Sequence, residues 1–457
     1  MDGLPTPRRY LAILAVSFGT GLAVLDGSIV TVALPTMARD LHVESSTSVL
    51  VVTIYQLTLV MSLLPLSAVG SHLGLRRVYQ CGQLIFLMST ALCFFAHSIA
   101  FLLVLRTIQA LGAGAALSVS SALIRSIYPA RRLGLGLGIN GVVVSVAGVI
   151  APTMGGLVLS IARWPWIFVA ACPFALLSLL LGRHALPDPV AHDEPFDVLG
   201  AVLCAVTFGL IISGLESLVH GDWPLIGGCI CFAGIGLAVV FVRRELRSKL
   251  PILPVDLLMR PIIGLSTIGG LVAFMGSTTI IFSLPFRLQQ QFGWLPVEIG
   301  AVIAPWPAAA AFAGFIAGIL SDRFPAGLLG GVGMAIAVVA MLLLAFLPPH
   351  PTHWEMVWRM ACCGCGYGLF LSPNSRLIIH SASHERAASA GGLVSTTRLT
   401  GQTLGATLLA ALLSTGAGTG PAPALTAMSL ALIAGICSIA RLRTPVGVGG
   451  RPNIQEI

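Results

Sequence analysis

Asp26 is the residue of this sequence best placed to exchange a proton inside a membrane. The chain has 17 Asp and Glu residues, and Asp26 alone lies well inside one of its long apolar segments. An ionised carboxylate in hydrocarbon is costly, so such a group is normally paired, hydrated or protonated. We expect Asp26 to take up and release a proton as its surroundings change. The alternative is a structural carboxylate capped by neighbours such as Ser28.

Arg106 and Arg359 also fall inside apolar segments, where an arginine needs an aqueous cavity or a partner. Arg106 lies about seven residues after the start of its segment, and Asp26 about six before the end of its own, so the two should share a depth. This match predicts an Arg106–Asp26 relay, direct or through water. The alternative for Arg106 is a side chain that reaches the nearest membrane surface.

Two further groups of residues could shape a transport pathway. Gly148, Pro152, Gly155 and Gly156 share one segment, where the glycines allow close helix approach and the proline removes a backbone hydrogen bond, as a gate requires. Aromatic and polar side chains could line a substrate cavity, although core packing or an interfacial belt is the better explanation for each: Tyr55, Gln56, Gln109, Trp306, Trp358, Arg359 and Tyr367.

The elements that carry these residues are membrane-spanning helices. Of the 457 residues, 56% are hydrophobic and only 9% are charged, against about 25% charged in soluble domains. This composition excludes a soluble enzyme and predicts an all-α polytopic membrane protein. Fourteen spans are expected: 11–32, 49–69, 78–96, 99–124, 135–159, 166–181, 198–215, 225–242, 262–284, 299–320, 328–347, 356–371, 392–414 and 424–439.

The net charge of +8 is explained by the positive-inside bias of a membrane protein rather than by a surface that binds nucleic acid. With both termini cytoplasmic, nineteen Lys and Arg residues fall in inner loops and tails and three, Arg39, Arg163 and Arg287, in outer loops. This asymmetry predicts a multi-pass protein with cytoplasmic termini and no nucleic-acid partner.

The two halves of the chain repeat. Ser71 to Arg77 after the second span corresponds to Ser321-Asp322-Arg323 after the tenth, and Arg106 corresponds to Arg359. Parallel six-helix repeats are one recognised transporter architecture. We expect a bundle over 1–190, two inserted helices over 191–250, a second bundle over 251–445 and a cytoplasmic tail over 446–457.

No chemistry beyond transport is indicated. Cys362, Cys363 and Cys365 lie in one helical run without a nearby histidine, so helix contact explains them better than metal binding. No nucleophile and base constellation and no phosphate loop is found. We therefore expect no metal, no cofactor and no enzymatic activity.

Four motifs resemble the 14-helix drug:proton antiporters of the major facilitator superfamily. They are Leu25 to Pro35 in the first span, Arg106 to Gly114 in the fourth, Ala151 to Gly156 in the fifth and Phe196 to Gly200 before the seventh. The resemblance implies export of amphipathic, often cationic, compounds such as drugs and antiseptics in exchange for protons. It implies proton coupling through Asp26 and Arg106, an antiport motif at Pro152, Gly155 and Gly156, and a monomer in a bacterial inner membrane.

The sequence departs from this family at the expected cytoplasmic gate, formed by Gly74, Arg76, Arg77, Asp322 and Arg323. Ser71 stands where the family has an acidic residue that helps to latch the cytoplasmic side, whereas Asp322 keeps its acid in the second half. Ala151, Thr31 and Ala171 also replace usual residues.

Two other functions are open from the sequence. A narrow-specificity metabolite carrier of the same fold, not necessarily coupled to protons, would remain active without the Asp26 carboxylate. A membrane-embedded enzyme or sensor would need an intramembrane catalytic cluster or a long soluble domain, and the sequence shows neither.

Overall fold

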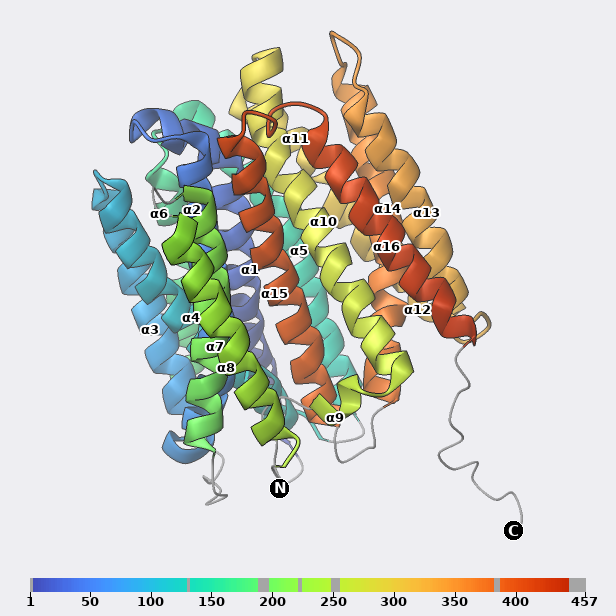
Figure 1. Cartoon of the computed structure of the whole chain (residues 1–457). Coiled ribbons are helices and arrows are strands. Elements are labelled where there is room, and N and C mark those ends of the chain that lie inside the picture. The colour runs from blue at the N-terminus through green and yellow to red at the C-terminus, as the bar shows by residue number, and fades with distance from the viewer. Residues whose placement is uncertain are drawn as a thin grey trace.

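The computed structural model describes residues 3–129, 132–187, 197–220, 224–247, 255–381 and 387–443. The regular structure of these residues is entirely helical, without a β-strand among them (Figure 1). The α-helices are α1 (Arg8–Asp40), α2 (Ser45–Leu73), α3 (Leu75–Leu92), α4 (Ile99–Ile127), α5 (Leu133–Ile161), α6 (Trp166–Ala185), α7 (Val198–His220), α8 (Pro224–Glu245), α9 (Val255–Leu258), α10 (Pro261–Phe292), α11 (Pro296–Ile303), α12 (Pro305–Leu320), α13 (Ala326–Ala345), α14 (His353–His380), α15 (Ala387–Ser414) and α16 (Ala422–Ala440).

The described chain contains 12 helical stretches long and apolar enough to cross a membrane, with α11 and α12 counted as one stretch. Helices α14 and α15 lie outside this set although each has 28 residues. Both carry arginine within the helix, Arg359 in α14 and Arg398 in α15. The described chain therefore has twelve candidate spans by length and composition, and two further helices of spanning length.

The long helices pack in two groups. In the first, α1 contacts α4, α5 and α6, while α3 contacts α4 and α6 and α2 contacts α4. In the second, α14 contacts α12 and α13, and α10 contacts α15 and α16. The expected domain borders near 190 and 250 and the tail 446–457 lie outside the described residues.

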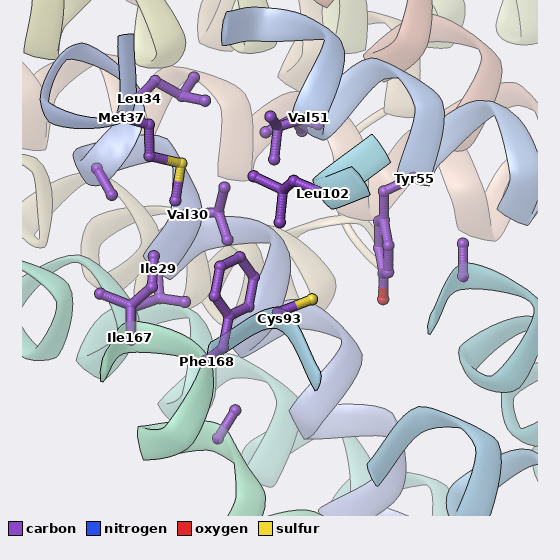
Figure 2. Close-up of a cluster of buried hydrophobic side chains, with 14 of the residues drawn as sticks. Ile29, Val30, Leu34, Met37, Val51, Tyr55, Cys93, Leu102, Ile167 and Phe168 are labelled. Atoms are coloured by element: carbon purple, nitrogen blue, oxygen red, sulfur yellow. The ribbon is translucent and has the colours of Figure 1, made fainter. Parts of the chain in front are cut away.

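Each group is centred on an apolar cluster, and the cluster of the first group extends into α10 and α15 of the second. The core of the first group includes Ile29 and Val30 from α1, Val51 from α2, and Ile167 and Phe168 from α6 (Figure 2). A separate cluster joins α10, α13, α14 and α16 in the second group. Buried apolar contact between helices thus fixes the position of α1, which carries Asp26.

The helical pair α7 and α8 packs against both groups, because α7 contacts α2 and α15. Thr407 of α15 donates a hydrogen bond of 2.5 Å to Glu216 of α7. Arg244 of α8 contacts Asp197 before α7 through two hydrogen bonds of 2.5 and 2.7 Å. The Thr407 bond ties α7 to the second group, whereas the Arg244 bonds tie α8 to the start of α7.

The two groups also contact each other directly. Helix α2 packs on α15, α5 packs on α11, and α1 packs on α10. Gln290 near the end of α10 donates a hydrogen bond to Ser45 at the start of α2. This bond and the start of α11 lie at the end of the molecule remote from the two chain termini (Figure 1).

Several expected helix limits are wrong. The loop expected over 71–77 reduces to Gly74, whose φ of 97° is accessible to glycine, so Arg76 lies in the first turn of α3. The expected tenth span divides into α11 and α12 before Pro305, which cannot donate a helical hydrogen bond. Arg287, expected in an outer loop, lies inside α10 and donates to the Leu344 carbonyl near the end of α13.

Candidate functional site

Asp26 and Arg106 form a direct ion pair between α1 and α4. Nη1 of Arg106 lies 2.6 Å from Oδ2 of Asp26, and both side chains are 0% exposed. The expectation of a shared depth thus corresponds to a direct contact, without a bridging group. Because the two opposite charges are buried together, each supplies the compensation that the other needs.

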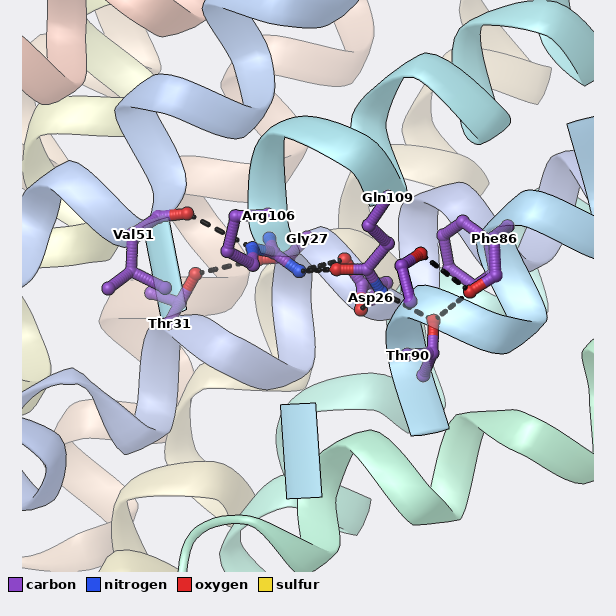
Figure 3. A network of polar contacts seen from close by, with 9 residues as sticks. Asp26, Gly27, Thr31, Val51, Phe86, Thr90, Arg106 and Gln109 are labelled. Carbon is purple, nitrogen blue, oxygen red and sulfur yellow. Dashed lines mark hydrogen bonds and ion pairs between the residues drawn. The ribbon is translucent and has the colours of Figure 1, made fainter. Parts of the chain in front are cut away.

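Gln109 completes the site around this pair (Figure 3). Its Oε1 accepts a hydrogen bond of 2.7 Å from Arg106, and its Nε2 donates to Oδ1 of Asp26 at 3.0 Å. The same Nε2 donates to the hydroxyl of Thr90 in α3, which in turn donates to the Phe86 carbonyl. Gln109 follows Arg106 by three positions, so both side chains leave the same face of α4. Both oxygens of Asp26 are therefore bonded.

Tyr55 of α2 separates the ion pair from the centre of the molecule. The Arg106 guanidinium lies 4.2 Å from the centre of the Tyr55 ring and 5.7 Å from that of Phe168. The Arg106 Nε donates to the Val51 carbonyl of α2, whereas its Nη2 has no partner in the part of the chain that the structure describes. Four helices therefore carry or contact this arginine, so a change in the charge of Asp26 would alter the interactions of all four.

A cavity of about 410 Å³ lies between the two helix groups. Residues of α1, α2, α4 and α5 line one side of it, and residues of α10, α11, α12, α14 and α15 line the other. Its volume is that of a small-molecule site. Gly27 and Ser28, which follow Asp26 directly, line it, whereas Asp26 and Arg106 do not.

The structure divides the residues expected to line a cavity. The cavity is lined by Tyr55, Gln56, Trp306 and Tyr367, and the ring centres of Trp306 and Tyr367 lie 5.1 Å apart. Gln109 is outside the lining because it bonds Asp26.

Trp358 and Arg359 of α14 are also outside the lining. The Arg359 guanidinium lies 4.7 Å from the centre of the Trp358 ring, and its Nη1 donates to the Glu355 carbonyl one turn earlier. Both residues precede Tyr367, the first α14 residue of the lining, by more than two helical turns.

Arg398 of α15 is the cavity residue that we did not anticipate from the sequence. Among the described residues it is the charged side chain in the lining, and Gln402 follows it one turn later. Positions four apart share a helix face, so both side chains face the cavity together. The one signal in the sequence is an arginine inside an apolar segment, and Arg398 shares this signal with Arg106 and Arg359.

The glycines of α5 lie where this helix meets the other elements. A Cβ atom on Gly156 would lie 2.5 Å from the Pro296 carbonyl oxygen of α11, and one on Gly155 would lie 3.0 Å from the Ile29 carbonyl oxygen of α1. Gly148 and Pro152 line the cavity instead. Gly156 thus allows α5 and α11 to approach closely at the end remote from the termini.

The expected gate residues are not brought together. Arg76 donates to the Arg183 carbonyl of α6 within the first group. Asp322 forms an ion pair of 2.7 Å with Arg376 of α14 within the second. Arg77 and Arg323 are exposed. The two halves of this surface are therefore each tied to their own helix group.

Two helix groups around a central cavity, with a buried acid and base beside it, define a multi-pass membrane transporter. The sequence profile described as Major Facilitator Superfamily matches residues 16–406 and again 266–456. The chain belongs to this superfamily.

Similar proteins include characterised and uncharacterised transporters. The Uncharacterized transporter YebQ of Escherichia coli (strain K12) is 41% identical over 97% of this chain and 98% of its own length. The Riboflavin transporter RibZ of Clostridioides difficile (strain 630) is 26% identical over 86% and 85%. The Multidrug resistance protein Stp of Mycobacterium tuberculosis (strain CDC 1551 / Oshkosh) is 27% identical over 89% and 76%.

The fold is shared with a solved structure, a bacterial homologue of the human lysosomal transporter Spinster in an inward-facing and unoccupied conformation. The two chains are 18% identical, with a TM-score of 0.71 over 96% of this chain and 98% of the other.

Proposed function

We propose that this protein exports amphipathic small molecules across a bacterial inner membrane in exchange for protons. It acts as a monomer of fourteen spans with both termini in the cytoplasm. Residues 1–190 and 251–445 form two six-helix bundles, 191–250 carries the two inserted helices, and 446–457 is a cytoplasmic tail.

One observation carries the proposal, namely a sealed acid–base network beside an open cavity. Asp26 is bonded to Arg106 and Gln109, and the next two residues of α1 line the cavity. Tyr55 touches both places, because its ring contacts Arg106 and also lines the cavity. A change in the protonation of Asp26 can therefore alter the substrate cavity through Tyr55.

The network has two chemically distinct states. With Asp26 ionised, the pair and the Gln109 bond join α1 to α4, as in the structure. A proton on Asp26 would cancel its charge and leave Arg106 buried without a counter-charge, which is unfavourable in apolar surroundings. We propose that this cost moves α1 relative to α4 and so alters the cavity wall at Gly27 and Ser28.

Alternating access requires that the two helix groups separate at one end while they close at the other. The contacts of Gly156 with Pro296 and of Gln290 with Ser45 close the end remote from the termini. With cytoplasmic termini, this arrangement is an inward-facing state. The α5 glycines would then act at the outer gate, and Arg76, Arg77, Asp322 and Arg323 at the cytoplasmic one.

The proposal is tested with everted membrane vesicles from pump-deficient bacteria. The compounds are ethidium, N-phenylnaphthylamine and anilinonaphthalene sulfonate, which carry positive, zero and negative charge. We expect wild type to accumulate at least one compound and a protonophore to abolish this. Asp26→Asn, at equal expression, should be inactive in the same assay. Accumulation that survives both changes would contradict proton coupling through Asp26.

A narrow-specificity metabolite carrier is the second candidate, and the similarity to a riboflavin transporter favours it. It predicts that no compound of the panel moves, although a specific metabolite does. Uptake or export that persists in Asp26→Asn would also favour this candidate.

A further inference from the structure

The central cavity has an unbalanced positive charge. Arg398 lies in its lining, and no Asp or Glu is among the described residues that line it. Within the described chain, Arg398 has no ion pair, and its guanidinium contrasts with that of Arg106, which Asp26 neutralises. A guanidinium stays charged and can only donate hydrogen bonds. The cavity therefore favours a solute that brings a negative charge.

Three other polar groups in the lining have no hydrogen-bond partner among the described residues. The hydroxyl oxygens of Tyr55 and Tyr367 and Oε1 of Gln56 are buried without a hydrogen bond, and the two tyrosines are 2% and 1% exposed. Buried polar groups are nearly always bonded, so these atoms point to a ligand or water that bonds them in use. Two of the three groups are hydroxyls that can donate to an oxyanion.

Most of the other lining residues are apolar, and some of them are aromatic. Phe274, Phe282 and Trp306 join the tyrosines, and the polar groups are few. Such a surface suits a ring system, which gains from contact with aromatic faces. An inorganic anion would leave most of this wall without a contact.

We propose that Arg398 is a substrate-binding residue and that the transported compounds are amphipathic organic anions, with an aromatic or other apolar body and a carboxylate or similar acidic group. Arg398 binds the acidic group, Gln402 and the tyrosine hydroxyls add hydrogen bonds, and Trp306 and Tyr367 contact the body. This inference rests on the proposed transport function and replaces the expectation of cationic substrates.

The test uses three probes that share one ring and differ in charge, namely naphthoate, naphthamide and naphthylmethylammonium. Binding to the purified full-length protein in detergent is measured by calorimetry at neutral pH. We expect naphthoate to bind most tightly and the ammonium probe most weakly. Arg398→Gln should weaken naphthoate binding about tenfold or more and leave naphthamide within about threefold, because a charge-assisted hydrogen bond is lost. Arg398→Lys, which keeps the charge, is the matched control and should retain the order of the probes.

Two results would overturn the inference. One is equal or absent binding of the three probes, or tightest binding of the ammonium probe, to wild-type protein, which does not depend on the folding of any variant. The other is naphthoate binding that Arg398→Gln leaves unchanged. Because binding needs no proton gradient, the expected order without proton-driven transport would contradict the proposed function alone. Proton-driven export of a cation would contradict this inference alone.

Discussion

At the scale of single residues, the structure is organised around one buried carboxylate and one buried guanidinium. Both carboxylate oxygens of Asp26 accept hydrogen bonds. Arg106 contacts three helices besides its own, through Asp26, the Val51 carbonyl and the Phe168 ring. Removal of one member of a buried ion pair costs more than removal of both, because the remaining charge has no compensation. The pair should therefore behave as one unit in both stability and transport.

This unit can be tested by its non-additivity. Arg106→Ala should lower the free energy of unfolding by about 3–5 kcal/mol, because it strands the Asp26 charge. The double variant Asp26→Asn, Arg106→Ala should recover at least half of that loss. The midpoint of thermal unfolding in detergent reports both, with Asp26→Asn alone as the reference. A double variant less stable than Arg106→Ala would show that the two residues are not a compensating pair.

The sequence predicted the pair but not its surroundings. The cost of charge in an apolar segment singled out Asp26, Arg106 and Arg359 equally, and helix depth matched the first two. It could not show that Gln109 bonds Asp26, or that Arg398 and not Arg359 faces the cavity. Which face of α14 or α15 turns inward depends on contacts with other helices, and those contacts are set by packing across the whole chain.

At the scale of elements, α5 connects the cavity to the contact between the helix groups. Gly148 and Pro152 line the cavity, whereas Gly156, one turn beyond Pro152, meets α11. A helix that carries both features can transmit a change in the cavity to the closed end of the molecule.

Gly156→Ala tests the close approach of α5 and α11. The added methyl group would meet the Pro296 carbonyl oxygen, and overpacking of this kind typically costs about 1–3 kcal/mol. Gly141→Ala is the matched control on the same helix, because a Cβ atom there has no neighbour within 4 Å. We expect Gly156→Ala to lower the thermal midpoint and Gly141→Ala to leave it unchanged or raise it slightly. Equal midpoints would argue against a tight α5–α11 contact.

Helix positions were largely predictable from hydropathy, and helix ends were not. The expected spans at 166–181 and 356–371 continue to Ala185 and His380, because polar residues near a membrane surface can remain helical. Gly74 and Pro305 each mark a helix boundary at a single residue, and hydropathy averaged over many residues does not detect such a boundary. Backbone chemistry at one residue, rather than composition, decides those limits.

In the whole molecule, a cavity lies between the two helix groups. The groups meet at the end remote from the termini (Figure 1). The expected repeat of two halves places Arg106 and Arg359 at corresponding positions, yet only Arg106 has a carboxylate partner in the described chain. The repeat therefore preserves the fold while the two halves differ in chemistry. Proton exchange belongs to the first half in our account, and Arg398 brings the substrate contact of the second.

In the proposed mechanism Asp26 couples proton movement to substrate movement, and one measurement separates these two activities. Purified protein is reconstituted into proteoliposomes, and a transported compound is followed both during accumulation driven by a pH gradient and during exchange of labelled for unlabelled compound without a gradient. We predict that Asp26→Asn abolishes the accumulation and keeps the exchange, because binding and alternating access remain while the proton site is lost. Accumulation by Asp26→Asn at the wild-type rate would contradict proton coupling through Asp26.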